Sequence, residues 1–136
     1  NTLLGGDGND LLSGGGGDNI LTGGAGDDLF VWQKGHVTPP AHDHITDFAG
    51  STLDATATAE DVLDLSDLLS DNSHMVAGFA VADASGTGEH LQLAMVNTST
   101  NTIVQTIDLN NVAASDATAQ QMLTTLLANG GIDDGQ

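Results

Sequence analysis

A nine-residue repeat near the start of the chain constrains its fold more than any other feature. Residues 5–31 read GGDGNDLLS, GGGGDNILT and GGAGDDLFV, three copies of G-G-x-G-x-D-x-U-x in which U is a large apolar residue. Residues 1–4 fit the end of an earlier copy. Such a fixed period indicates an architecture in which each unit is stabilised by stacking on its neighbours.

Each copy can be divided into a turn and a short strand. Its first six residues require backbone conformations that glycine adopts at little cost. Its last three form a strand whose apolar side chain points inward. Two copies make one coil of a parallel roll, with Leu3 and Leu21 expected in one sheet. Leu12 and Phe30 are expected in the other, and this small core cannot stabilise the roll by burial alone.

The charge of the chain indicates which partners it can have. Nineteen acidic residues face one basic residue, Lys34, and the formal net charge is −18. A compact state with this charge repels itself, so nucleic acid and anionic membranes are excluded and bound cations are favoured. The absence of cysteine excludes disulfides and thiolate metal sites. No apolar run reaches about 18 residues, so we expect no membrane insertion, and we expect a monomer.

The repeat supplies the ligands that calcium prefers. Calcium takes 6–8 oxygen ligands in flexible geometry. Glycine-rich turns can direct carbonyl oxygens to a common point, and the sixth position adds a carboxylate. One turn provides about half of this shell, so an ion must lie between stacked turns. We therefore predict a strong site between turns 5–10 and 23–28, through Asp10 and Asp28. A weaker site is expected at turn 14–19, where Asn19 brings no charge.

The predicted calcium ligands follow from these positions. In the repeats they are Gly6, Asp7, Gly8, Asn9, Asp10, Gly15, Gly17, Asp18, Asn19, Gly24, Gly26, Asp27 and Asp28. Beyond the repeats they are Asp43, Asp47, Asp61 and Asp64. Asp7, Asp18 and Asp27 do not occupy the sixth position. We expect their side chains to be solvated surface charges, with backbone carbonyls that still bind.

Two later segments repeat the second half of the nonapeptide. Asp43-His44-Ile45 and Asp61-Val62-Leu63 both match D-x-U, and their aspartates are 18 residues apart, as are Asp10 and Asp28. We therefore expect a degenerate coil that extends the roll and closes it. The chain is predicted to be mainly β, with a parallel β-roll over 1–48 and a β-rich cap with a C-terminal helix over 49–136.

The cap is predicted from hydrophobic periodicity and turn signals. Its expected elements are a flexible insertion at 50–59, a strand at 76–82 and a hairpin of 90–96 with 102–109. Ser66 is expected to cap a short helix at 67–70. Ser115 or Asp116 is expected to start a helix that runs to about Ala128. The tail from Ile132 is expected to be mobile.

The seventh position of the repeat carries outward apolar side chains, among them Leu11, Ile20 and Leu29. Exposed apolar patches mark interaction sites or require a cover. We expect the rest of the chain to cover one sheet. The alternative is a ligand-binding surface on the roll, with Leu11, Leu29 and Val31 on it.

The sequence resembles a known family. Its nonapeptides resemble the calcium-binding RTX repeat of bacterial secreted proteins. The stretch DHITDFAG…EDVLDLSDLL is similar to the segment after the last repeat in type I secretion C-terminal target domains. LDLSDLL and the terminal helix resemble the end of large RTX adhesins. The resemblance implies a roll that is disordered without calcium, and an uncleaved signal for the type I secretion machinery. It also implies a secreted or cell-surface bacterial location at the C-terminus of a larger protein. An RTX protease, lipase or toxin is the alternative parent.

A histidine cluster allows a different hypothesis. His36, His42 and His44 lie close in sequence, and His42 and His44 could bind zinc together with Asp43. Catalytic zinc needs about three protein ligands and an open position. The sequence has no HExxH and no GxSxG motif. We therefore expect solvated loop histidines and no enzymatic activity.

Overall fold

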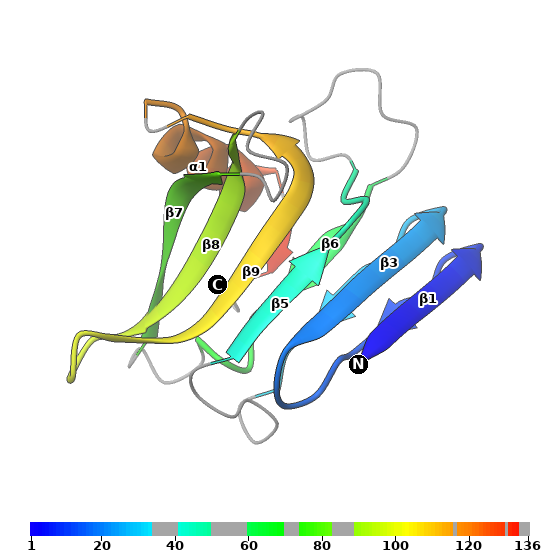
Figure 1. Ribbon diagram of the computed structural model, residues 1–136, viewed down its shortest axis with the longest axis horizontal. Helices are drawn as coiled ribbons and strands as arrows, with labels where there is room; N and C mark the ends of the chain where they lie inside the picture. Colours follow the sequence, from blue (N-terminus) through cyan, green and yellow to red (C-terminus); the bar gives the residue numbers. More distant parts are fainter. Residues whose placement is uncertain are drawn as a thin grey trace.

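The computed structural model consists of two β-sheets and one helix (Figure 1). It describes residues 1–33, 41–49, 60–69, 74–82, 89–115, 117–129 and 131–133. The insertion expected at 50–59 lies outside these residues, as does His36. Among the described helices, none is long and apolar enough to cross a membrane.

The larger sheet has six strands in the order β1-β3-β5-β9-β8-β7. They are β1 (Thr2–Asp7), β3 (Asn19–Ala25), β5 (Ala41–Ile45), β9 (Thr102–Ala113), β8 (Glu89–Asn97) and β7 (His74–Ala82). The smaller sheet has four strands in the order β10-β6-β4-β2. They are β10 (Ile132–Asp133), β6 (Val62–Asp64), β4 (Leu29–Val31) and β2 (Leu11–Leu12). The helix α1 spans Ala119–Ala128.

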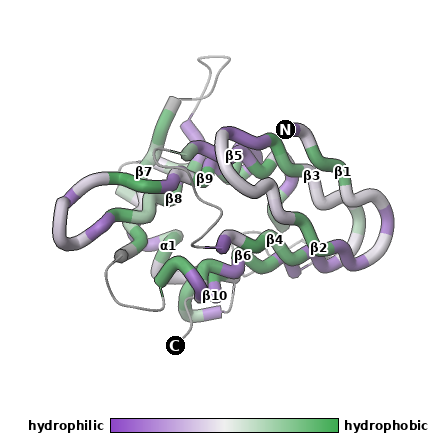
Figure 2. Tube along the Cα trace, turned by 90° about the horizontal axis from the view of Figure 1, so that it is seen from below, coloured by the Kyte–Doolittle hydropathy of each residue, from purple (hydrophilic) through white to green (hydrophobic). Residues whose placement is uncertain are grey.

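The parallel strand pairing expected of the roll is present. Leu3 pairs with Leu21 in the larger sheet, and Leu12 pairs with Phe30 in the smaller one. The inward apolar residues Leu12, Leu21 and Phe30 lie between the two sheets. They are buried because the sheets face each other across them (Figure 2). The mainly β fold class is thereby confirmed.

The degenerate coil is also present, but it does not end the sheets. Asp43 pairs with Asn19, and Leu63 pairs with Phe30, in the register of a further coil. Beyond it, β9 adds in parallel to β5, and β10 adds in parallel to β6. The expectation of a mobile tail from Ile132 is therefore wrong for β10, because backbone pairing and burial of Ile132 hold it in the smaller sheet.

The cap contains the expected hairpin. Strands β8 and β9 are antiparallel, with Leu91, Leu93 and Met95 buried on the inner face. Helix α1 packs against β7 through Ala119 and Leu123, which approach Gly78. Helix α1 thus covers the inner face of the larger sheet mainly at β7, next to β10 of the smaller sheet.

Two expected helix starts are wrong. Residues 66–69 form a single turn, closed by the N–H of Leu69 on the carbonyl of Leu65 at 3.0 Å. The side chain that accepts hydrogen bonds at its start is that of Asp64, which accepts from the N–H and hydroxyl of Ser66. Helix α1 has Thr118 as its N-cap, without a side-chain capping bond. Ser115 is not the cap: its N–H and hydroxyl interact with the Thr118 hydroxyl one turn before the helix.

Three of the outward apolar side chains of the roll are exposed, whereas Leu29 and Val31 are half-buried. Leu4 is 75% exposed, Leu11 is 70% exposed and Ile20 is 45% exposed. The expectation that the rest of the chain covers one sheet is therefore wrong for these residues. The physical reason is that α1 packs against β7 in the cap instead of against an outer face of the roll.

Candidate metal sites

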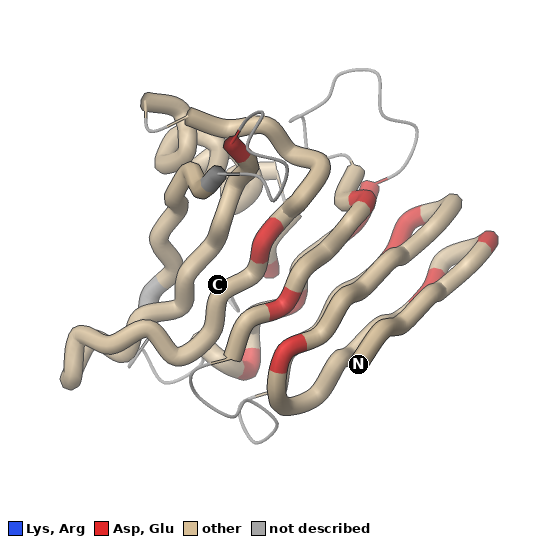
Figure 3. Tube along the Cα trace, in the orientation of Figure 1, with Lys and Arg blue, Asp and Glu red and all other residues tan. Residues whose placement is uncertain are grey.

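The sixth-position aspartates form a row along one edge of the roll, where turns 5–10 and 23–28 stack. The backbone N–H of Asp10 donates to Oδ1 of Asp28 at 2.9 Å. The backbone N–H of Asp28 donates to Oδ1 of Asp61 at 2.9 Å. Figure 3 shows acidic residues at successive turns of the roll. Each coil therefore places one carboxylate next to that of the preceding coil, and we call Asp10, Asp28 and Asp61 the carboxylate row.

Two oxygens of the carboxylate row lack a hydrogen-bond partner among the described residues. Oδ2 of Asp10 and Oδ2 of Asp28 are buried and accept no hydrogen bond from the described residues. A buried charged oxygen is costly unless it is paired, hydrogen-bonded or bound to a metal. Carboxylate oxygens are also the ligands that calcium prefers. The donor set of this edge therefore fits a calcium ion.

The first glycine of each copy makes room for the side chain at the sixth position. A Cβ at Gly5 would lie 2.7 Å from Oδ2 of Asp10, and a Cβ at Gly23 would strike Oδ2 of Asp28. At Gly14 it would lie 2.5 Å from the Asn19 amide. These glycines are therefore required by the proximity of the side chain at the sixth position.

The second and fourth glycines have a different role. Gly6, Gly8, Gly15, Gly17, Gly24 and Gly26 all have positive φ. The carbonyl oxygens of Gly6 and Gly8 lie against Gly24 and Gly26, where a Cβ would overlap them. The two turns of the strong predicted site are therefore stacked in close backbone contact.

The electrostatics of this edge indicate a shortage of positive charge. Burial raises the pKa of Asp61 to about 6, against hydrogen bonds from the N–H groups of Asp28 and Ala49 that lower it. The charges of Asp28 and Asp47 raise it further. Burial on this edge therefore disfavours the ionised form of Asp61, which becomes the main form only above about pH 6.

A second row, at the fifth position of the repeat, was not predicted. Oδ1 of Asn9 accepts the N–H of Asp27 at 2.9 Å, and Oδ1 of Asp27 accepts the N–H of Glu60 at 2.9 Å. Oδ1 of Asp18 accepts the N–H of His42 at 3.0 Å. Asp18 and Asp27 are exposed, as expected, but their carboxylates also accept backbone N–H groups of the next coil. The signal was present, since the fifth position is Asn or Asp in every copy.

The opposite edge has a different chemistry. Oδ1 of Asp43 accepts the backbone N–H of Asn19 at 2.8 Å and its Nδ2 at 2.9 Å. Oδ2 of Asp43 accepts Nε1 of Trp32 at 2.6 Å and Nε2 of Gln105 at 3.1 Å. Four N–H groups thus compensate this buried carboxylate. Oδ1 of Asn19 accepts no hydrogen bond from the described residues. It is an amide oxygen and carries no charge, unlike the carboxylate oxygens of the first edge.

The remaining predicted ligands are separated by the fold. Asp47 lies beside turn 23–28, where its carboxylate accepts the N–H groups of Gly23 at 3.0 Å and Gly24 at 2.7 Å. Asp64 is at the far end of β6 and accepts from Ser66. Asp7 is exposed at the end of β1. The first edge therefore gathers Asp10, Asp28, Asp47 and Asp61, while Asp43 and Asp64 lie elsewhere.

The zinc ligands suggested by sequence proximity are not assembled as a set. The side chain of Asp43 is buried on the inner face of β5. Those of His42 and His44 point to the opposite face, because side chains alternate along a strand. On that outer face both imidazoles meet Asp108 of β9. The two histidines therefore meet Asp108, which strand pairing brings close, and not Asp43, which lies between them in the sequence.

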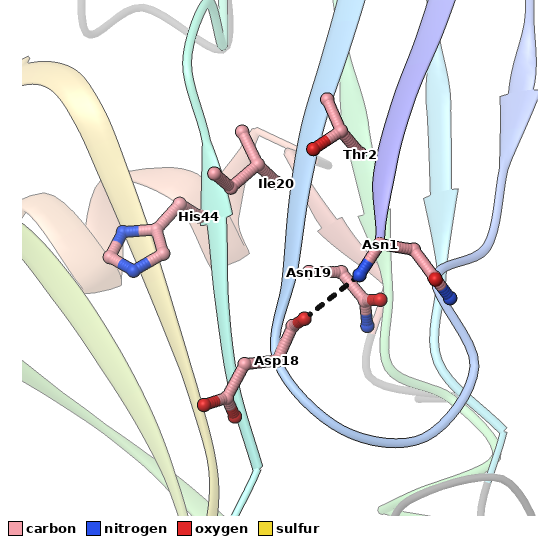
Figure 4. Close-up of a pocket in the computed structure, with 6 residues that line it drawn as sticks. All are labelled: Asn1, Thr2, Asp18, Asn19, Ile20 and His44. Atoms are coloured by element: carbon pink, nitrogen blue, oxygen red, sulfur yellow. Dashed lines mark hydrogen bonds between the residues drawn. The ribbon is translucent and has the colours of Figure 1, made fainter.

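A pocket on the roll is lined by Asn1, Thr2, Asp18, Asn19, Ile20 and His44 (Figure 4). The N-terminal nitrogen of Asn1 donates to the carbonyl of Asp18 at 3.1 Å. The ring of His44 lies at one side of this pocket and points toward β9 (Figure 4). Asp18 is the one acidic residue among those that line the pocket, and its carboxylate already accepts the N–H of His42. The lining residues therefore do not form a metal site.

Two family models match different parts of the chain. Residues 1–30 match the family described as RTX calcium-binding nonapeptide repeat (4 copies). Residues 49–129, more than half of the chain, match the family described as a protein of unknown function (DUF3240). No curated protein matches the chain. The repeats that form the first coils are thus calcium-binding repeats.

Proposed function

Since the chain belongs to the family of unknown function DUF3240 and begins with RTX calcium-binding nonapeptide repeats, we propose that it is a non-catalytic module that folds on binding calcium. In this proposal it accompanies the type I secretion of a larger bacterial protein. RTX repeats are typical of exported proteins, and their usual role is structural calcium binding. We assign the chain to secretion because of its net charge and the coupling of its folding to calcium binding.

The observation that carries the proposal is the pair of unpartnered oxygens, Oδ2 of Asp10 and Oδ2 of Asp28. Both are buried on the edge where Asp61 has a raised pKa. Bound calcium supplies the positive charge that this edge lacks. Asp10 and Asp28 would hold it, with oxygens of turns 5–10 and 23–28 completing the shell.

The chain's own charge then determines when the roll forms. At a formal net charge of −18, the carboxylates repel one another and favour an expanded chain. A site that exists only in the folded state couples binding free energy to folding free energy. An expanded chain at low calcium suits passage through a narrow conduit, and folding at high calcium suits an extracellular protein.

We favour an RTX adhesin as the parent protein, with an RTX protease, lipase or toxin as the alternative. A second candidate function is ligand binding by the roll surface. It is supported by the exposure of Leu4, Leu11 and Ile20. Leu4 is on the larger sheet and Leu11 is on the smaller one, so a single ligand surface would use one sheet.

Calcium titration by calorimetry, with parallel circular dichroism, tests the proposal. With excess chelator we expect residues 1–48 to unfold, and calcium to restore the β signal in proportion to the heat of binding. Magnesium at the same concentration is the control, because it demands a tighter octahedral shell and retains its waters. An unchanged spectrum in chelator would contradict calcium-dependent folding.

A further inference from the structure

Three histidines surround one carboxylate oxygen on the outer face of the larger sheet. Nε2 of His42 lies 2.8 Å from Oδ2 of Asp108, and Nδ1 of His44 lies 3.3 Å from it. Nε2 of His90 lies 3.3 Å from the same oxygen. The residues come from β5, β9 and β8, which are neighbours in the sheet. The cluster therefore joins segments that are far apart in the sequence.

The cluster is held in place by its surroundings. The side chain of Asp108 is 4% exposed, and its other oxygen, Oδ1, accepts Nε2 of Gln92 at 2.8 Å. The rings of His42 and His44 are stacked, with centroids 4.5 Å apart. Outer-shell hydrogen bonds of the kind made by Gln92 orient metal-binding carboxylates in proteins. Oδ2 is thus directed at the imidazoles by a fixed neighbour.

The distances suit a tetrahedral metal. Zinc binds His nitrogen and Asp oxygen at about 2.0–2.2 Å, which places neighbouring ligand atoms about 3.3–3.5 Å apart. The distance from Nδ1 of His44 to Oδ2 is 3.3 Å. The nearest ligand atoms of His42, His44 and Asp108 all lie within 4.8 Å of one another. A small rotation of the half-exposed His42 ring would complete the geometry.

We propose that His42, His44 and Asp108 bind one zinc ion. Two imidazoles and one carboxylate are typical ligands of zinc, whereas calcium requires a shell of oxygens. Three protein ligands leave the fourth tetrahedral position to water. His90 lies near the Asp108 carboxylate but outside the group of mutually close ligand atoms, so we assign it to the surroundings of the site. The side chains of His42 and His44 are 41% and 35% exposed, so the ion has access from solvent.

This site would connect the two parts of the molecule. His42 and His44 belong to the degenerate coil of the roll, and Asp108 belongs to the cap hairpin. Zinc would therefore stabilise the junction between β5 and β9 independently of the calcium edge. The inference goes beyond the calcium-binding function and does not depend on it.

Cobalt substitution in the calcium-saturated full chain tests the site. Saturating calcium occupies the carboxylate row, so that added Co²⁺ reports on the histidines. We expect one equivalent of Co²⁺ to produce the intense visible absorption of tetrahedral coordination, and one equivalent of Zn²⁺ to abolish it. A spectrum without tetrahedral bands, or weak binding of several equivalents, would overturn the proposal.

Variants locate the ion. His44→Ala and His42→Ala alter partly exposed side chains, and we expect each to weaken Zn²⁺ binding at least tenfold, the lower limit for losing even an outer-shell partner. His74→Ala removes a histidine from β7, at the far edge of the sheet, and is the matched control. Circular dichroism in calcium verifies that each variant is folded. Equal zinc affinity in all three variants would show that the cluster is a hydrogen-bonded network without a metal, and would refute the proposal.

Discussion

The backbone N–H of Asp10 donates a 2.9 Å hydrogen bond to the carboxylate of Asp28, which lies one coil further along the roll. This bond occupies Oδ1 of Asp28 and leaves Oδ2 buried without a partner among the described residues. The Asp28 carboxylate thus holds two coils in register through Oδ1 and offers Oδ2 to a cation. Stacking and metal binding are therefore coupled at a single side chain.

Removing the charge of Asp28 should weaken calcium binding strongly. In Asp28→Asn we expect calorimetric calcium affinity to fall at least about tenfold, since loss of even an outer-shell partner costs 10–100-fold. Asp7→Asn removes the same charge from an exposed position of the first turn and keeps its backbone carbonyl. Equal affinities in the two variants would mean that calcium responds only to net charge.

Adding a charge at Asn19 should strengthen the other edge. Asn19→Asp replaces a neutral oxygen that has no partner in the described structure. Two carboxylates about 4 Å apart repel by about 4 kcal/mol near a protein surface, so the variant should unfold more readily in chelator. Calcium titration should show an additional or tighter step. Asn101→Asp, in the β8–β9 turn, is the control, and an isotherm like that of the wild type would contradict a second site.

The space provided by the first glycine gives a position-matched test. Gly23→Ala places a methyl group against Oδ2 of Asp28, and Gly14→Ala places one against the amide of Asn19. Overpacking of this kind costs about 1–3 kcal/mol, so chemical denaturation should show both to be destabilised. We expect only Gly23→Ala to lower the affinity of the strong site as well. A larger calcium effect in Gly14→Ala would reverse the assignment of the edges.

The ionisation of Asp108 gives a pH test. Burial raises the pKa of this carboxyl, but hydrogen bonds from Gln92, His42 and His90 and the charge of His42 lower it below its usual value. Ionised Asp108 therefore contributes stability that is present above the usual aspartate pKa, near 3.9. This contribution is lost as the pH falls through the lower, folded-state pKa.

Carboxyl carbon NMR in the calcium-loaded, zinc-free protein measures this pKa directly. In Gln92→Ala, which lacks the 2.8 Å bond to Oδ1, we expect the pKa of Asp108 to rise. Gln121→Ala, on the exposed side of α1, should leave it unchanged. An unaltered pKa in Gln92→Ala would show that the imidazoles alone keep this carboxylate ionised.

Sequence reasoning predicted the roll because the repeat encodes it locally. Positive-φ glycines, one inward apolar residue per copy and a period of nine are properties of short segments, and each of them was readable without any distant contact. The D-x-U matches at Asp43 and Asp61 predicted the degenerate coil, where Ile45 and Leu63 are buried. Their spacing of 18 residues did not predict its register, because Asp43 pairs with Asn19 on one edge and Asp61 lies beside Asp28 on the other. The fifth-position side chains are exposed, as expected, but their hydrogen bonds to the next coil were not predicted.

Only the tertiary structure decided how the carboxylates differ. Asp28 and Asp43 occupy equivalent positions of the pattern, yet Trp32 and Gln105 satisfy Asp43 while Oδ2 of Asp28 has no described partner. Gln105 comes from a strand 62 residues away from Asp43, so no local pattern announces it. The meeting of His44 with Asp108 likewise depends on the pairing of β5 with β9. Local periodicity therefore determined the coils, the turns and the positions of the ligands. Long-range strand pairing determined which of those ligands are compensated by the protein and which remain for a cation.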